Sequence, residues 1–155
     1  MESAAIDEVD PRSSDVAALI AAHLTFARDY TPAADVHALD QGSLLDPSVT
    51  LFGLRVDGEL LAVGALRQLD THHGELKSMH TAEAARGRGL GRAMVSHLVE
   101  EARSRGCNRV SLETATYDAF APSRALYRAT GFVECEPFGD YEASPTRVCM
   151  TRSVD

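Results

Sequence analysis

The hydrophobic positions of the chain follow two periodicities, and their order predicts the fold class. Apolar residues recur at helical spacing in residues 14–29 and again in residues 90–105, where every fourth position from Leu90 to Ala102 is apolar. From residue 49 to residue 69 the apolar positions alternate instead, as in two strands joined by the turn Asp57-Gly58. Helical and strand patterns together predict a mixed α/β or α+β domain.

Turn residues and shorter apolar runs complete the predicted order of elements. Further strands are expected at residues 4–9, 75–81, 108–114, 132–137 and 146–152, and further helices at residues 33–39 and 122–130. Glycine follows two of the helices, at Gly106 and Gly131, where the chain favours a left-handed residue. The resulting order is β-α-α-β-β-β-α-β-α-β-β. Since no repeat or linker interrupts it, we expect residues 1–155 to form a single domain.

Composition and charge narrow the classes of function. The 155 residues are 45% hydrophobic and 25% charged, as in ordinary globular proteins, with neither a membrane-spanning apolar run nor a signal segment. A net charge of −8 argues against nucleic acid as a partner, because such binding depends on basic surface. Three cysteines without a Cys-x-x-Cys pair favour a reducing, cytoplasmic location over a disulfide framework.

The segment Arg-Gly-Arg-Gly-Leu-Gly-Arg, from Arg86 to Arg92, carries the strongest functional signal. It joins a predicted strand to a predicted helix, so backbone N–H groups and the positive end of the helix dipole meet there. Gly87, Gly89 and Gly91 allow the backbone to approach a ligand closely. With the arginines they predict an anion site, most plausibly for a pyrophosphate. The plainer alternative is a tight turn with solvated arginines.

Three nucleotide-binding motifs compete for this loop. The chain contains no Gly-x-x-x-x-Gly-Lys-Ser/Thr string, which excludes a P-loop. A dinucleotide-binding loop requires a third glycine where Arg92 stands. The third motif, Gln/Arg-x-x-Gly-x-Gly/Ala, is satisfied by residues 86–91, which resemble the acetyl-CoA loop of the GNAT acetyltransferases.

The rest of the chain supports that resemblance. The order of elements is similar to the GNAT fold, and residues 75–81 and 108–114 look like its fourth and fifth strands. Residues 125–132, Ala-Leu-Tyr-Arg-Ala-Thr-Gly-Phe, resemble the family's Ala-x-x-Leu-Tyr…Gly-Phe segment with a shorter alanine spacing. The resemblance implies a central twisted, mostly antiparallel sheet with a parallel pair splayed at the acetyl-CoA site. It also implies direct attack of an amine on the acetyl thioester.

The resemblance assigns the cofactor contacts to one strand and one loop. The backbone of Met79, His80 and Thr81 is expected to pair with the pantetheine arm, and a bulge in this strand to free an N–H at or beside Met79 for the thioester carbonyl. The pyrophosphate is expected on Arg86, Gly87, Arg88, Gly89, Leu90, Gly91 and Arg92. No metal is expected, because His72 and His73 lack a third ligand at a recognisable spacing.

Two side chains are the predicted catalytic groups. The attacking amine must lose a proton, and Glu75 is the first candidate for the base, with Glu113 second. For either carboxylate the alternative is a solvated group or a partner for an arginine. Tyr127 matches the family's helix tyrosine near the cofactor sulfur, so its phenol is expected to hydrogen-bond the departing thiolate. Its alternative role is to anchor the helix on the sheet.

The substrate-binding residues are the least specified. Residues 36–40 and 137–141 resemble a branch of small bacterial GNAT proteins, which makes His37, Asp40 and Tyr141 candidates beside Glu113. One departure from the family concerns the cofactor arm. Many GNAT enzymes carry asparagine where Phe120 stands, which puts that polar contact in doubt.

The expected function is therefore acetyl transfer from acetyl-CoA to the amine of a small molecule. Neither a membrane nor nucleic acid is expected as a partner, and the resemblance allows a homodimer. Two alternatives stay open. One is a protein or peptide N-acetyltransferase, and the other is a noncatalytic acyl-CoA-binding module.

Overall fold

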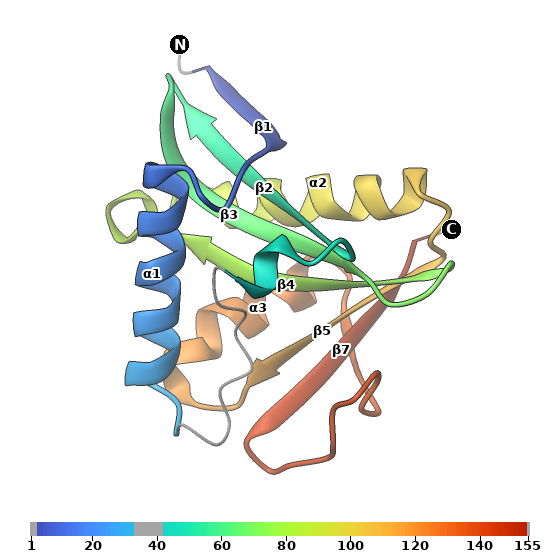
Figure 1. The fold of residues 1–155 in the computed structure, drawn as a ribbon. Coiled ribbons are helices and arrows are strands. Elements are labelled where there is room, and N and C mark those ends of the chain that lie inside the picture. Colours follow the sequence, from blue (N-terminus) through green and yellow to red (C-terminus); the bar gives the residue numbers. More distant parts are fainter. Residues whose placement is uncertain (1–2, 33–41, 155) are drawn as a thin grey trace.

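One mixed sheet forms the centre of the structure, a computed structural model that describes residues 3–32 and 42–154 (Figure 1). Within these residues the sheet has seven strands in the order β1-β2-β3-β4-β5-β7-β6. The strands are β1 Ala4–Glu8, β2 Val49–Val56, β3 Glu59–Gln68, β4 His73–Thr81, β5 Arg109–Ala115, β6 Val133–Cys135 and β7 Arg147–Ser153. Neighbouring strands are antiparallel except β4 and β5, which are parallel. This confirms the predicted fold class.

Helices cover both faces of the sheet. Helix α1 (Ser14–Asp29) lies on one face, where Val16 and Ile20 pack against β2 and β3. Helices α2 (Leu90–Ser104) and α3 (Ala121–Ala129) lie on the other face and share the larger core. Short 3-10 turns occur at Ser43–Leu45, Glu83–Ala85 and Asp118–Phe120 (η4). None of the described helices is long and apolar enough to cross a bilayer.

The predicted elements agree with the structure apart from their ends. Strand β4 begins two residues earlier than expected, at His73, because the parallel pairing with β5 starts there. Strand β6 is shorter than expected and ends at Cys135, close to Pro137, which lacks an N–H for a strand ladder. The helix predicted at residues 33–39 lies outside the described residues. The two predicted helix-ending glycines, Gly106 and Gly131, have positive φ of 89° and 96°.

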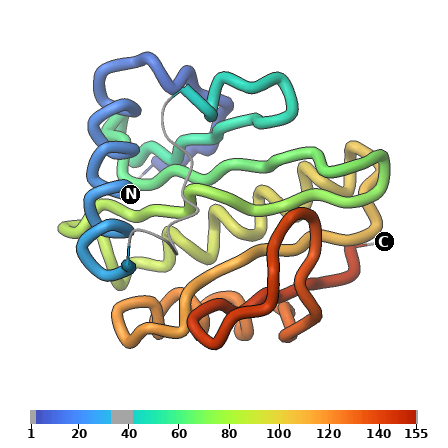
Figure 2. Tube along the Cα trace, turned by 60° about the horizontal axis from the view of Figure 1, so that its bottom comes forward, coloured from blue at the N-terminus to red at the C-terminus, as the bar shows by residue number. Residues whose placement is uncertain are grey.

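The segment between β6 and β7 lies against β4 on the α1 face of the sheet. In the turned view of Figure 2 this orange-to-red segment comes forward beside the strands. The ring of Phe138 packs on His73 at 5.7 Å, and the phenol of Tyr141 reaches Lys77 on β4. The loop therefore closes one side of the region where β4 and β5 run together.

Candidate active site

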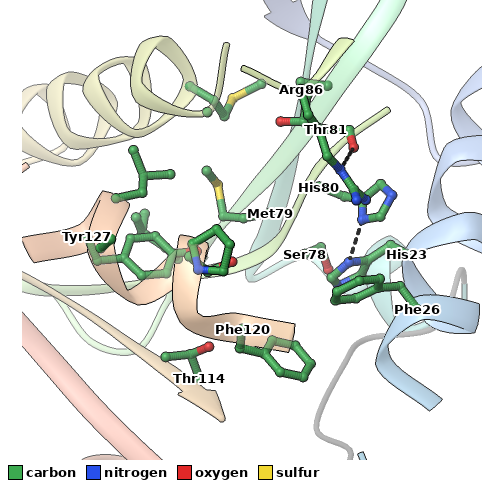
Figure 3. Close-up of a pocket in the computed structure, with 18 of the residues that line it drawn as sticks. His23, Phe26, Ser78, Met79, His80, Thr81, Arg86, Thr114, Phe120 and Tyr127 are labelled. Carbon is green, nitrogen blue, oxygen red and sulfur yellow. Dashed lines mark hydrogen bonds between the residues drawn. The ribbon is translucent and has the colours of Figure 1, made fainter. Parts of the chain in front are cut away.

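A cavity of about 700 Å³ opens between α1, the end of β4, the end of β5 and the starts of α2 and α3. Figure 3 shows its lining residues. The predicted site residues that line it are Met79, His80, Thr81, Arg86, Gly87, Gly89, Gly91, Arg92, Glu113 and Tyr127. Four predicted site residues of the described chain do not line it, namely Glu75, Arg88, Leu90 and Tyr141. Two others, His37 and Asp40, lie outside the described residues.

The cavity exists because the two parallel strands separate. Pairing between β4 and β5 runs from His73 opposite Arg109 to Leu76 opposite Leu112 and then stops. Both strands continue beyond that point, β4 to Thr81 and β5 to Ala115. Backbone groups of two strand ends therefore face a gap, which confirms the predicted splayed pair.

Strand β4 is also bulged at the edge of this gap. Lys77 pairs with Ala65 and His80 pairs with Val63, so Ser78 and Met79 together face the single residue Gly64. Ser78 has φ of 54°, a left-handed conformation that costs a residue other than glycine about 1–2 kcal/mol. Such a bulge leaves one backbone N–H outside the ladder. The predicted bulge is confirmed, and its strain is concentrated on a cavity-lining residue.

The glycine and arginine loop leads directly into α2. Gly87 and Gly89 have φ of 80° and 79°, and a Cβ built on either would have no atom within 4 Å. Gly89 caps the helix without any side-chain hydrogen bond, and the first turn holds no acidic residue. No side chain therefore caps the start of α2, and the positive end of its dipole lies beside a loop with open space above its glycines, as an anion site requires.

The arginines of the loop differ in their surroundings. The Nε of Arg86 donates to the carbonyl of Thr81 at 3.3 Å, and its guanidinium stacks 5.5 Å from the ring centre of Phe26. Arg92 donates to the carbonyl of Ala129 at 3.4 Å, which ties α2 to α3. Both side chains belong to the cavity wall, so fixed positive charge surrounds the start of α2.

Tyr127 reaches the cavity from α3. Its side chain packs edge-on against Phe132, with ring centres 6.0 Å apart, and the residue is 7% exposed. Burial raises the pKa of the Tyr127 phenol, and the charge of Glu113 raises it further. The phenol therefore stays protonated at neutral pH and can act as a hydrogen-bond donor.

Glu75 belongs to a buried network behind the cavity wall. The residue is 2% exposed, and its Oε2 accepts a hydrogen bond of 2.6 Å from the phenol of Tyr141. The same oxygen lies 3.4 Å from the Nζ of Lys77, which in turn donates to Tyr141 at 2.8 Å. The pKa of Tyr141 is raised by burial and then by the charge of Glu75. Glu75 is thus neither solvated nor paired with an arginine.

Glu113 is paired with an arginine, which the sequence analysis gave as the alternative to a catalytic role. Its Oε1 lies 3.8 Å from the Nε of Arg147, and both side chains are 12% exposed. It nevertheless lines the cavity, from a position on β5 one residue beyond the last pair with β4. An ion pair with arginine and a place in the cavity wall are therefore combined in one residue.

Aromatic residues from α1 and η4 form the remaining wall, and sequence reasoning did not identify their grouping. The Nδ1 atoms of His23 and His80 lie 3.2 Å apart, so one ring donates an N–H hydrogen bond to the other. Phe26 contacts Phe120 edge-to-face at 5.4 Å. In Figure 3 His23, Phe26 and His80 lie opposite Tyr127 across the cavity, and Phe120 lies between the two sides. His23 and Phe26 occur at ordinary positions of a helical pattern, which carry no signal of a site.

Comparison with known protein families identifies the family to which the chain belongs. The sequence profile of the Acetyltransferase (GNAT) family matches residues 17–132, which include the bulged strand, the loop and Tyr127. The chain belongs to the GNAT acetyltransferase family. It is 39% identical to the uncharacterized N-acetyltransferase YsnE of Bacillus subtilis over 96% of this chain and 97% of that protein.

Further relatives of this GNAT protein agree in fold and class. The uncharacterized N-acetyltransferase YedL of Escherichia coli is 40% identical over 84% of this chain and 82% of its own. A crystal structure named as an acyl-CoA N-acyltransferase from Klebsiella pneumoniae superposes with a TM-score of 0.81 at 25% identity, covering 98% of both chains. The protein is accordingly an enzyme, an acyltransferase of the GNAT family.

The cavity of this GNAT protein fits an acyl-CoA. The open space above Gly87 and Gly89 leaves room for a phosphate against the backbone. The buried hydroxyl of Ser78 has no hydrogen-bond partner among the described residues, as expected for a group that a ligand satisfies. The described residues contain no group of three His, Cys, Asp or Glu side chains placed to hold a metal ion.

Because of the paired histidines His23 and His80, we expect the folded protein to lose stability against unfolding at acidic pH. Burial lowers the pKa of His23 and His80 from 6.5 to about 4, and the charges of His80 and then Lys77 lower that of His23 further, as Arg86 does for His80. Between these values the unfolded chain binds more protons than the folded protein, so stability falls as the pH drops through that window. The melting temperature of His23→Asn is expected to decline less from about pH 7 to pH 4 than that of the wild type. His72→Asn, on an exposed turn, is the control, and equal slopes for His23→Asn and wild type would contradict the prediction.

Proposed function

We propose that the protein transfers the acetyl group of acetyl-CoA to the amine of a small molecule. The observation that carries the proposal is the gap between the ends of β4 and β5, where one cavity meets the bulge at Met79, the phenol of Tyr127 and the carboxylate of Glu113. These groups match the three demands of the reaction. They are a donor for the developing oxyanion, a proton donor near the leaving group and a base.

The cosubstrate contacts follow from the same geometry. The N–H groups of residues 87–92 and the arginines Arg86, Arg88 and Arg92 would bind the pyrophosphate. The free edge of Met79, His80 and Thr81 would pair with the pantetheine arm as an added strand. Leu90 packs against the core and holds the start of α2 in place. Acetyl-CoA, when bound, supplies the activated acetyl group.

The protein's own residues would then stabilise the charge that develops on the thioester and transfer the protons. The bulge N–H donates to the carbonyl oxygen that gains negative charge, and a carboxylate receives the proton of the amine. Tyr127 donates to the sulfur as its bond to carbon breaks. In balance, one C–N bond forms and one C–S bond breaks, while the amine loses a proton and the thiolate gains one.

Two carboxylates remain as proposals for the base. Glu113 lines the cavity and can receive a proton directly or through one water. Glu75 does not line it. From Glu75 the route leads through the phenol of Tyr141, which would pass its own proton to Glu75 and, because Tyr141 does not line the cavity either, take one from the amine through a water. The shorter route favours Glu113.

A small acceptor is favoured over a peptide by the aromatic wall. The contact between Phe26 and Phe120 joins α1 to η4 across the acceptor side of the cavity. An extended peptide needs an open groove at this point. The cysteines support the proposed cytoplasmic location, since Cys107, Cys135 and Cys149 are free thiols.

The function is tested by a screen of primary amines with acetyl-CoA in which free thiol is measured. Release of thiol that depends on the amine supports the proposal. Binding of CoA without thiol release from any small amine, but with acetylation of peptides, favours the peptide alternative. Binding of CoA without any acetylation favours a noncatalytic acyl-CoA-binding module.

Tyr127→Phe is expected to lower kcat by about 10-fold to 30-fold, because the hydrogen bond to a developing thiolate contributes roughly 1.5–2 kcal/mol. The phenol of Tyr127 sits in the cavity wall, while its ring packs on Phe132. Phenylalanine keeps this packing, so affinity for acetyl-CoA should change little. Steady-state kinetics and calorimetry measure the two effects, and unchanged kcat would remove the proton-donor role.

A further inference from the structure

Lys77 is a buried cation in the wall of the acceptor side of the cavity. It lies on β4 one residue beyond the last pair with β5, and its side chain is 7% exposed. Burying an ammonium group is costly unless partners compensate for the water it loses. The position of Lys77, directly at the gap between the strands, therefore calls for a reason.

The partners of Lys77 leave part of its binding capacity unused. Its Nζ donates to the phenol of Tyr141 and pairs with Glu75, at 2.8 Å and 3.4 Å. The phenol also donates to Glu75, so the three groups hold one another in place. An ammonium group has three donors, and these two contacts occupy two of them. Within the described residues one N–H of Lys77 is left for a ligand in the cavity.

A carboxylate stands on the opposite side of the gap. In the β4–β5 register Glu75 pairs with Ser111, and side chains two residues further along each strand lie on the same face. Lys77 and Glu113 therefore occupy matching positions on that face, just after the strands part. The cavity thus carries a cation on the β4 side and an anion on the β5 side.

Ring side chains from α1, β4 and η4 gather in another part of the cavity wall. Phe26 and Phe120 contact each other, and His23 and His80 form a hydrogen-bonded pair beside them. Figure 3 shows His23, Phe26 and His80 grouped on one side of the cavity, with Phe120 below. The rings of Phe26 and Phe120 offer apolar surface to a ligand, and Phe26 also carries the guanidinium of Arg86 near its ring. The acceptor side therefore combines two opposite charges with one apolar surface.

From this arrangement we infer that the acceptor is a free amino acid with an apolar side chain. Lys77 binds the carboxylate of the acceptor, Glu113 faces its amine, and the Phe26–Phe120 wall contacts its side chain. Glu75 and Tyr141 are positioning residues for Lys77. A peptide N-terminus has a neutral amide where this carboxylate stands, so peptides are poor acceptors. The inference rests on the proposed function and assigns its substrate class.

Matched acceptors test the inference. Phenylalanine, phenylalaninamide and phenethylamine share one aromatic body and differ in the carboxylate. We expect Lys77→Met to lower kcat/KM for phenylalanine, relative to phenylalaninamide, by about 10-fold to 100-fold compared with the wild type. The intrinsic basicity of each amine cancels in this comparison. An equal loss for all three acceptors, or a wild-type preference for the two acceptors without a carboxylate, would overturn the inference.

A second variant guards against misfolding. Lys77→Met leaves the buried carboxylate of Glu75 without its cation, and an unpaired buried charge is strongly destabilising. The double variant Glu75→Gln with Lys77→Met removes both charges together. It is expected to show the same loss of preference for phenylalanine, with a cooperative thermal unfolding transition as the folding control. If the double variant folds and retains the wild-type preference, Lys77 does not bind the carboxylate.

Binding measurements separate this inference from the proposed function. Calorimetry is performed first with CoA alone and then with phenylalanine added to the CoA-loaded protein, a pair that cannot react. Binding of phenylalanine to the wild type and its loss in the Lys77 variants support the inference. Failure to bind CoA contradicts the proposed function itself. Binding of CoA together with turnover of only carboxylate-free amines retains the function and overturns the substrate class.

Discussion

Gly89→Val is expected to lower the affinity for CoA by at least about 100-fold, the larger of the two strongest effects that the structure predicts. Gly89 has φ of 79° and caps α2, where a branched side chain strains the backbone by about 1–2 kcal/mol. The space above it is open, so the added side chain would also occupy the position proposed for the pyrophosphate. Calorimetry with CoA measures the loss.

Gly58→Val provides a matched control for backbone strain. Gly58 has φ of 87° and equally open space, but it lies in the turn between β2 and β3, away from the cavity. Both variants should melt at a lower temperature than the wild type, and only Gly89→Val should lose CoA. If Gly89→Val binds CoA as the wild type does, the loop does not hold the cofactor.

The parts of this site that could be predicted are those formed by residues close together in the sequence. The loop at residues 86–92 can be recognised from the sequence because its glycines and the start of α2 follow one another along the chain. Tyr127 was identified from the family resemblance, through the Leu-Tyr…Gly-Phe pattern of residues 126–132. The bulge in β4 came from the family resemblance alone, since nothing in a serine indicates the positive φ of Ser78.

The parts that could not be predicted depend on contacts between distant segments. Glu75 and Tyr141 are 66 residues apart, and their hydrogen bond exists only because the β6–β7 segment lies against β4. That contact removes Glu75 from the cavity wall, although its position on the strand suggested a base. His23 meets His80 across 57 residues for the same kind of reason. Helix periodicity predicts which face is buried, but it does not predict which residue of another element that face meets.

Phe120 illustrates what a departure from a family motif can and cannot reveal. The sequence put in doubt the polar contact that many GNAT enzymes make from this position. It did not indicate that the ring would pack on Phe26 from α1 and make an apolar wall. The departure itself could be read from the sequence, whereas the contact between Phe120 and Phe26 could not.

Glu113→Gln is expected to lower kcat/KM by about 100-fold, because a positioned base contributes roughly that factor or more. The amide has nearly the shape of the carboxylate but cannot accept the proton of the amine. Glu113 lines the cavity beyond the last β4–β5 pair, so the substitution acts at the reacting nitrogen. The profile of kcat/KM against pH should lose its acid limb, and affinity for CoA should be retained.

Glu75→Gln and Tyr141→Phe decide between the two carboxylates. If Glu113 is the base, Tyr141→Phe should lower kcat/KM by less than about 10-fold, because it interrupts the route to Glu75 and removes one of the two contacts that position Lys77, without touching the base itself. Glu75→Gln should act mainly on stability, since it leaves the buried ammonium of Lys77 without an anion. A loss near 100-fold in both of these variants, with the acid limb retained in Glu113→Gln, would instead assign the base to Glu75 acting through the phenol of Tyr141.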